Sequence, residues 1–209
     1  MKVECITVGP FEVNCYVAWN ARPDALVIDP GADAERILDF LDHYGLQVAV
    51  YLLTHGHADH VSALAPLHRA RPAPIAMHPL DQRWAFGPDN QIPPYYAVPD
   101  APERVARPMR EGQRWEDAGL AYEVIETPGH TPGGVCLYLP LEKTLFAGDT
   151  LFRGSVGRTD RPGASARVLT ESLRKLARLP DDVVVYPGHG PATTIGEEKR
   201  NNVFLRSAV

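Results

Sequence analysis

Four side chains that can bind a metal ion fall within six consecutive residues of this 209-residue sequence. They are His55, His57, Asp59 and His60, in the pattern H-x-H-x-D-H. In a chain of this composition, such a pattern arises by chance with a probability on the order of one in a thousand. The motif therefore indicates a metal site more strongly than a random cluster of polar residues.

Three later segments share one form: a short apolar run, a turn rich in glycine or proline, and a single potential ligand. The ligands are His130 after Thr127-Pro128-Gly129, Asp149 after Phe146-Ala147-Gly148, and His189 after Tyr186-Pro187-Gly188. A glycine before each ligand lets the backbone turn sharply and lets a metal approach closely. We expect all three side chains to be strand-end ligands directed at a common point. The remaining histidines, His43, His68 and His78, lack this setting and are assigned surface or structural roles.

Imidazole and carboxylate ligands without thiolate suit zinc, iron or manganese, and the set is too rich in nitrogen for calcium or magnesium. Seven candidates exceed the four ligands of a closed structural zinc site, so the sequence predicts two divalent ions, zinc being the first choice. One ion would take His55, His57 and His130, and the other Asp59, His60 and His189, with Asp149 bridging both. Water held between ions roughly 3.5 to 4 Å apart would ionise near neutral pH and attack an electrophile, with Asp59 orienting it and taking up its proton.

The elements that must position these ligands alternate between strands and helices. Strands are expected at 3–8, 13–19, 25–28, 48–53, 75–78, 120–126, 135–139, 143–147 and 183–186. One helix is expected to begin after Asp33, which would be its N-cap, and to end just before Gly45. Further helices are expected at 61–70, 165–179 and 195–204. The proline-rich segment 79–116 is expected to be a covering loop with short helical pieces. This order predicts an α/β fold of two similar halves packed sheet to sheet with helices outside, in a single domain spanning 1–209.

Composition limits the partners. The formal net charge is −5, and no run of lysine or arginine provides a basic surface, so neither nucleic acid nor a membrane is expected as a partner. The cysteines, Cys5, Cys15 and Cys136, lie in apolar runs and are expected to be buried free thiols in a reducing compartment. Without a signal-peptide core or an apolar stretch of membrane-spanning length, the chain is expected to be cytoplasmic.

These motifs resemble those of the metallo-β-lactamase superfamily, most closely its glyoxalase II-like hydroxyacylglutathione hydrolases. The resemblance runs from Asp29-Pro30-Gly31 through the motif at 55–60, T-P-G-H-T-P-G-G, A-G-D-T-L-F and the segment 153–160 to Y-P-G-H-G-P. It implies an αββα four-layer sandwich of two mixed β-sheets flanked by helices, with a dinuclear site at one edge and the same seven ligands. It also implies hydrolysis of a small-molecule thioester such as S-lactoylglutathione, in a short form that lacks the family's C-terminal helical domain.

Other activities of the superfamily match less well. The main dizinc β-lactamases carry a cysteine where Asp149 stands, the flavodiiron proteins carry a glutamate where His57 stands, and the nucleases are generally longer. A persulfide dioxygenase, with one iron bound by His55, His130 and Asp149, is retained as an alternative, and a non-catalytic metal-binding module as a second one.

Departures from the family concern substrate binding. Arg158 stands near a position where glyoxalase II enzymes have lysine, and it could hold a substrate carboxylate or form an ordinary surface ion pair. Pro191 stands where they have a tyrosine. Tyr95 and Tyr96 could cover the acyl group or anchor their loop. The acyl group, the thiol and the oligomeric state stay open.

Overall fold

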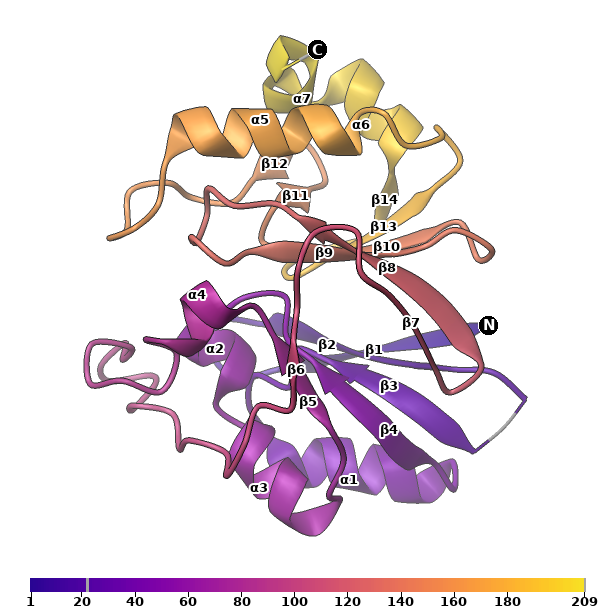
Figure 1. Cartoon of the computed structure of the whole chain (residues 1–209), viewed down its shortest axis with the longest axis vertical. Helices are drawn as coiled ribbons and strands as arrows, with labels where there is room; N and C mark the ends of the chain where they lie inside the picture. Colours follow the sequence, from indigo (N-terminus) through magenta and orange to yellow (C-terminus); the bar gives the residue numbers. More distant parts are fainter. Residues whose placement is uncertain (22, 209) are drawn as a thin grey trace.

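The computed structural model describes residues 1–21 and 23–208 and has four layers, helices against sheet against sheet against helices (Figure 1). The protein therefore has the predicted α/β architecture, an αββα sandwich of two mixed β-sheets. Among the described residues, no helix combines the length and apolar character that crossing a bilayer requires.

The first sheet comes from the N-terminal half of the chain. Its spatial order is β1 (Lys2–Val8), β2 (Val13–Trp19), β3 (Asp24–Ile28), β4 (Gln47–Leu52), β5 (Ile75–Met77) and β6 (Arg107–Pro108). β1, β2 and β3 pair antiparallel, whereas β3 to β6 run parallel. Helices α1 (Ala34–His43) and α3 (Leu64–Ala70) cover its outer face (Figure 1).

The second sheet comes from the C-terminal half. Its spatial order is β14 (Thr193–Thr194), β13 (Val184–Pro187), β10 (Thr144–Gly148), β9 (Val135–Leu139), β8 (Leu120–Glu126) and β7 (Arg114–Asp117). The parallel pair β10 and β13 brings two of the predicted ligand-bearing turns to the same edge. Outside this sheet lie α5 (Ala166–Leu176), α6 (Ile195–Asn201), α7 (Val203–Ala208) and the hairpin of β11 (Leu151–Phe152) and β12 (Ser155–Val156).

Strand β2 shows why the sheets pack on both faces. All of its residues are buried, and they alternate between two apolar layers, as successive side chains of a strand must. Cys15 and Val17 join the layer beneath the outer helices, whereas Tyr16 and Ala18 join the layer between the sheets. The buried end of β4 shows the same alternation, with Tyr51 in the first layer and Val50 and Leu52 in the second.

The local predictions were largely confirmed, with three differences. The side chain of Asp33 does not cap α1; it accepts the backbone N–H of Gly9 instead, at 2.8 Å. The helix expected at 61–70 is α3 preceded by the short α2 (Ala58–Val61), and the one expected at 195–204 is split into α6 and α7. The short strands β6, β7, β11, β12 and β14 were not predicted, because two to four residues carry too little periodic pattern.

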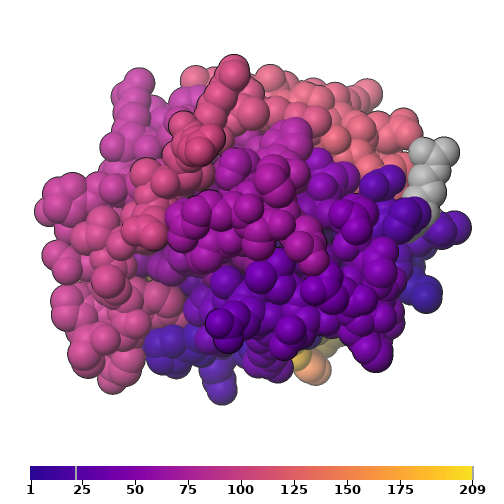
Figure 2. All heavy atoms as spheres, turned by 90° about the horizontal axis from the view of Figure 1, so that it is seen from below, coloured from indigo at the N-terminus to yellow at the C-terminus, as the bar shows by residue number. Residues whose placement is uncertain are grey.

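The proline-rich segment forms a rim on one side of the molecule. It contains α4 (Pro79–Gln82), and β6 and β7 then return it to the sheets. Figure 2, viewed from the side of α1 and α3, shows this pink segment projecting beside the purple helices. Tyr96 is buried and Tyr95 is exposed, and both rings pack on Phe11, at centroid distances of 5.4 and 5.3 Å. The aromatic pair thus anchors the loop, the second of the two roles considered for it.

Candidate metal centre

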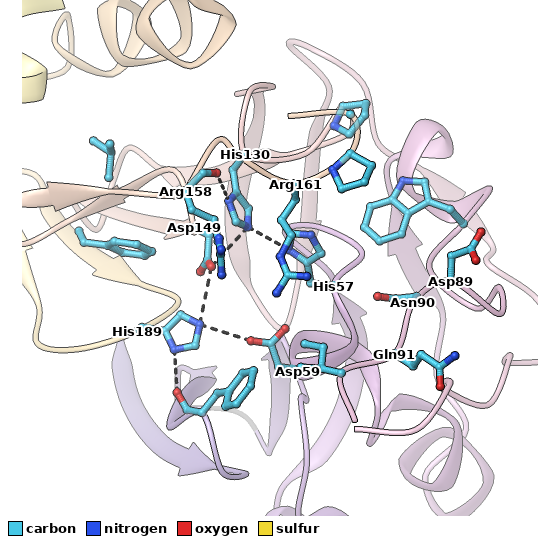
Figure 3. A pocket seen from close by; sticks show the side chains of 18 of the residues that line it. His57, Asp59, Asp89, Asn90, Gln91, His130, Asp149, Arg158, Arg161 and His189 are labelled. Atoms are coloured by element: carbon cyan, nitrogen blue, oxygen red, sulfur yellow. Dashed lines mark hydrogen bonds and ion pairs between the residues drawn. The ribbon is translucent and has the colours of Figure 1, made fainter. Parts of the chain in front are cut away.

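The seven predicted ligands lie in segments that follow four strands, five in loops and Asp59 and His60 in the short helix α2, and these segments meet at one edge of the sandwich. β4 leads into the motif at 55–60, β8 into His130, β10 into Asp149 and β13 into His189. The ligand-bearing loops of both sheets are therefore brought together, although they are separated by up to 134 residues along the chain. Figure 3 shows His57, Asp59, His130, Asp149 and His189 converging around a common space.

One cluster contains His55, His57 and His130. Their ligand atoms all lie within 4.8 Å of one another, and His130 Nε2 is only 2.9 Å from His57 Nδ1. A second cluster, with the same spread of ligand atoms, contains Asp59, His60 and His189. In it, His60 Nε2 is 3.4 Å from His189 Nε2, and Asp59 Oδ2 is 3.6 Å from the same His189 atom. These clusters coincide with the two groups expected from the sequence.

Asp149 lies between the two clusters. Its Oδ2 is 3.5 Å from His130 Nε2 in the first cluster and 3.6 Å from His189 Nε2 in the second, and its Oδ1 is 3.5 Å from His60 Nε2. A carboxylate with contacts on both sides has the position that a bridging ligand needs.

Hydrogen bonds fix the tautomers of the imidazoles. His130 Nδ1 donates to the carbonyl oxygen of Arg158, and His189 Nδ1 to that of Phe11, each at 2.9 Å, because a carbonyl oxygen can only accept. His60 Nδ1 likewise faces the carboxylate of Asp29, at 3.1 Å. In each of these rings, Nδ1 is the donor and Nε2 is left to face the cluster. Such outer hydrogen bonds orient metal-binding histidines and set the nitrogen that coordinates.

His55 follows the same rule through Thr54. The Thr54 hydroxyl donates to Asp29 Oδ2 at 2.6 Å, so its oxygen accepts from His55 Nδ1 at 3.1 Å. Asp29 also accepts the backbone N–H of Thr54 at 2.8 Å. Asp29 lies close enough to His55 and His60 to form a third cluster with them, but these bonds occupy its oxygens. Asp29 therefore orients Thr54 and His60 through hydrogen bonds. The sequence analysis noted Asp29-Pro30-Gly31 only as part of the family resemblance and did not assign Asp29 this role.

Two atoms of the site are buried without a hydrogen-bond partner, and they test whether metal ions fit here. They are His55 Nε2 and Asp149 Oδ1. Leaving such atoms unpaired is costly, and both are good ligand atoms for zinc, iron or manganese. His57 Nδ1 and His130 Nε2, 2.9 Å apart, also point at one another, and both are potential ligand atoms for the same ion. The residues fit divalent metal binding.

Electrostatics support the same conclusion. Burial lowers the pKa of His55 well below its ordinary value and that of His57 to about 3, so both imidazoles are neutral and free to coordinate. Burial opposes charge on His60 as well, but the carboxylates of Asp149 and Asp59 outweigh it and raise its pKa to about 10. The carboxylates of Asp149 and Asp59 thus favour a positive charge beside them, which a proton on His60 supplies when no metal ion is bound.

Glycines before two of the ligands are required by close packing. A Cβ added at Gly188 would lie 2.2 Å from Asp149 Oδ1. One added at Gly148, where φ is +48°, would lie 2.3 Å from the Thr54 hydroxyl oxygen. The prediction of a sharp turn is confirmed at Gly148, and at both positions the absence of a side chain lets other groups of the site pack against the backbone.

The clusters open into a cavity of about 880 Å³, a volume in the range of small-molecule sites. His57, Asp59, His130, Asp149 and His189 reach its surface. Its other walls combine apolar side chains with polar ones: Phe11, Trp84, Ile92, Pro132, Phe152, Val156, Pro162, Asp89, Asn90, Gln91, Ser155, Arg158 and Arg161. The metal centre is therefore accessible to a molecule rather than sealed as a structural site would be.

Arg158 lies on this cavity wall, but its guanidinium forms a bidentate pair with Asp160, at 2.7 and 2.8 Å. The surface ion pair considered for Arg158 is therefore present. Arg161 is the second cationic side chain of the cavity wall. The sequence analysis missed it, because only Arg158 stands near a position where the family has a basic residue.

Two further residues that hold the ligand loops were also missed. Asp81, fully buried, accepts the backbone N–H of Gly56 at 2.9 Å and that of Gly133 at 2.6 Å. It thereby ties the loop of His55 and His57 to the loop of His130. Asn90 accepts the N–H of Ala58 at 3.1 Å and donates to the carbonyl of Gly56 at 2.8 Å. Both lie in or near the proline-rich segment, where no periodic pattern distinguished them.

The histidines assigned structural roles lie outside the clusters. His78 is buried, caps α4 by accepting the N–H of Leu80 at 3.1 Å, and contacts Glu126 at 3.0 Å. His68 contacts the ring of Tyr51, and His43 that of Tyr44. Cys15 and Cys136 are buried as expected, whereas Cys5 is exposed, so that part of the cysteine prediction was wrong.

The fold and this centre define a class of metal-dependent α/β-sandwich proteins with a paired histidine and carboxylate site. The family model of the metallo-β-lactamase superfamily matches residues 8–189, and the chain belongs to that superfamily. A protein of Haemophilus influenzae named hydroxyacylglutathione hydrolase GloC is 37% identical over 99% of both chains.

Solved structures support the same placement. The crystal structure of BLEG-1 B3 metallo-β-lactamase is similar with a TM-score of 0.92 and 33% identity, covering 98% of this chain and 99% of that one. The crystal structure of TTHA1623 in a di-iron-bound form has a TM-score of 0.86 and 40% identity, covering 96% of this chain and 99% of that one.

Proposed function

We propose that the protein hydrolyses thioesters, with S-lactoylglutathione as the first substrate to test, at a centre of two divalent ions. The observation that carries this proposal is the placement of Asp149 between the two three-ligand clusters on the floor of an open cavity. The name of the Haemophilus relative supports the choice of substrate.

The seven predicted ligands would hold the two ions in the two groups described above. When bound, such ions supply Lewis acidity, which polarises a carbonyl group and makes water more acidic. Zinc is the first candidate by ligand chemistry, and iron is the second, because the similar structure of TTHA1623 is described as di-iron-bound.

The chain's own groups then divide the remaining work. Asp59 faces the cavity, and the imidazoles of His60 and His189 lower the pKa of its carboxyl group although burial opposes this, so the carboxylate is ionised. It orients the attacking water and accepts its proton. The apolar wall, including Trp84 and Phe152, shields the reacting carbonyl from bulk water. A departing thiol has a pKa near 8.5, so the thiolate leaves without a strong acid to protonate it.

The test compares the purified wild type with Asp59→Asn on S-lactoylglutathione, after the metal content of each has been measured. We expect turnover by the wild type and a loss on the order of a hundredfold or more in the variant. Asp39→Asn, an exposed carboxylate on α1, is the matched control and should keep full activity. Wild-type turnover no faster than that of Asp59→Asn would contradict the proposal.

Two other activities are measured in parallel. Oxygen consumption on glutathione persulfide with one bound iron would favour the dioxygenase alternative, with His55, His130 and Asp149 as ligands. Opening of a β-lactam ring is included because BLEG-1 is named a β-lactamase. Bound metal with none of these activities would favour the non-catalytic module.

A further inference from the structure

Arg161 and Arg158 are the two cationic side chains on the cavity wall, and their surroundings differ. Arg158 is neutralised by its bidentate pair with Asp160. Arg161 is exposed, and within residues 1–21 and 23–208 no carboxylate lies in ion-pair distance of its guanidinium. Among the described residues, Arg161 is therefore the cationic side chain of the cavity wall that is not held in an ion pair.

The loop that carries Arg161 is held at both ends against the metal centre. At one end, the carbonyl of Arg158 accepts His130 Nδ1 at 2.9 Å. At the other, the N–H of Ser165 donates to the carbonyl of Gly129 at 2.7 Å. Both bonds join the loop to the turn at His130, so Arg161 has a restricted position relative to that ligand.

A tight turn follows Arg161 directly. Its carbonyl accepts the N–H of Ala164 at 3.0 Å, and Gly163, with φ of +83°, lies against Pro132. Figure 3 shows the Arg161 side chain extending into the cavity beside His57.

Elsewhere the wall offers an anion only Arg158, which is paired with Asp160, and neutral polar side chains. Apart from the metal-centre residues, Asp89 is the acidic side chain that lines it, and the other lining residues are apolar or neutral. A ligand would therefore place its uncharged reactive part along the apolar wall and any carboxylate at Arg161. A guanidinium binds carboxylates with two parallel hydrogen bonds, which makes it selective for that group.

We propose that Arg161 is a specificity-determining residue that binds a carboxylate of the substrate, so that the protein prefers carboxylate-bearing thioesters over neutral ones. The carboxylate can belong to the thiol half or to the acyl half of the molecule. This inference rests on the proposed thioester hydrolysis and names the substrate class of that same site.

A binding measurement tests the inference independently of turnover. Calorimetric titration of the metal-loaded protein with S-methylglutathione and with its diethyl ester compares a ligand that has both carboxylates with an analogue that keeps the amine but has both carboxylates esterified. We expect the wild type to bind the acid about tenfold or more tightly than the ester, and Arg161→Gln to lose that preference. Arg161→Lys should retain part of it, because it keeps the charge without the paired hydrogen bonds.

Kinetics then identify which half carries the anchor. S-lactoylglutathione has its carboxylates in the thiol half, S-glutaryl-N-acetylcysteamine has one in the acyl half, and S-lactoyl-N-acetylcysteamine has none. Arg161→Gln should raise KM about tenfold for whichever charged thioester uses the anchor, with kcat nearly unchanged, and leave the neutral one unaffected. Arg167→Gln, an exposed arginine on α5 outside the cavity wall, is the matched control and should not change either constant.

Equal affinity of the wild type for acid and ester, or an unchanged preference in Arg161→Gln, would overturn the inference. Hydrolysis of neutral and charged thioesters with equal kcat/KM would also overturn it while leaving the proposed function intact. Failure to hydrolyse any thioester would instead contradict the proposed function, and the titration would still decide whether Arg161 selects carboxylates.

Discussion

His57 Nδ1 and His130 Nε2 lie 2.9 Å apart, although their residues come from different sheets. His130 Nδ1 is already committed as a donor to the Arg158 carbonyl, so a neutral His130 presents a lone pair to its neighbour. The chain therefore holds two imidazole nitrogens, both potential ligand atoms, close enough to bind one cation together. This relationship leads to the first prediction.

His130→Ala should reduce the metal content from two ions per chain to about one, because the first cluster keeps only two imidazoles. Elemental analysis after dialysis against metal-free buffer measures this. His43→Ala, which removes an exposed histidine from the end of α1, provides the control and should keep both ions. An unchanged stoichiometry in His130→Ala would show that His130 is not a ligand.

Asp81→Asn should weaken metal binding roughly 10- to 100-fold, the usual effect of removing a hydrogen-bond partner behind a metal site. One carboxylate oxygen of Asp81 accepts the N–H of Gly56, and the other accepts the N–H of Gly133, so Asp81 joins the two loops that carry the first cluster. The side-chain amide of an asparagine has only one oxygen to accept these two N–H groups. Competition with a chromophoric chelator measures the affinity. Asp39→Asn serves as the control, and equal affinity in Asp81→Asn and wild type would argue against a positioning role for Asp81.

Gly188→Ala should abolish hydrolysis, because the added methyl group would lie 2.2 Å from Asp149 Oδ1 and displace that carboxylate. Gly112→Ala is the comparison: φ is +73° there, but nothing lies within 4 Å of an added Cβ. Backbone strain alone should cost Gly112→Ala about 1 kcal/mol of unfolding free energy and leave activity intact. Full activity in a folded Gly188→Ala protein would contradict the bridging position of Asp149.

Removing the metal should lower the thermal stability, since ligands that bind only the folded state stabilise it by mass action. At a free metal concentration of about 1,000 times Kd, the gain per site is about 4 kcal/mol. Melting curves with and without a strong chelator test this, and re-addition of zinc, manganese or ferrous iron identifies the ions that restore the melting temperature. Identical melting temperatures would mean that the folded chain does not bind metal tightly.

The sequence predicted which side chains converge, because a metal site needs particular side chains at particular turns. Glycine before Asp149 and His189 marks each turn, and the apolar strands before them are long enough to show their pattern. The two-sheet arrangement followed from the order of those strands.

Residues that act through backbone hydrogen bonds could not be found in this way. Asp81 and Asn90 support the site by accepting N–H groups of distant loops, and no local pattern distinguishes such residues from ordinary polar ones. The sequence also could not show that Arg158, and not Arg161, forms the ion pair with Asp160, because the fold of the loop decides which guanidinium lies beside that carboxylate. Asp33 shows the converse, since its side chain prefers a long-range partner, Gly9, over its own helix.

Anomalous diffraction from crystals of the metal-loaded protein, recorded at the absorption edge of the bound metal, tests the central claim most directly. The account predicts two peaks per chain, one among His55, His57 and His130, the other among Asp59, His60 and His189, with Asp149 within coordination distance of both. A single peak held by His55, His130 and Asp149 alone, or no peak within reach of these side chains, would contradict it.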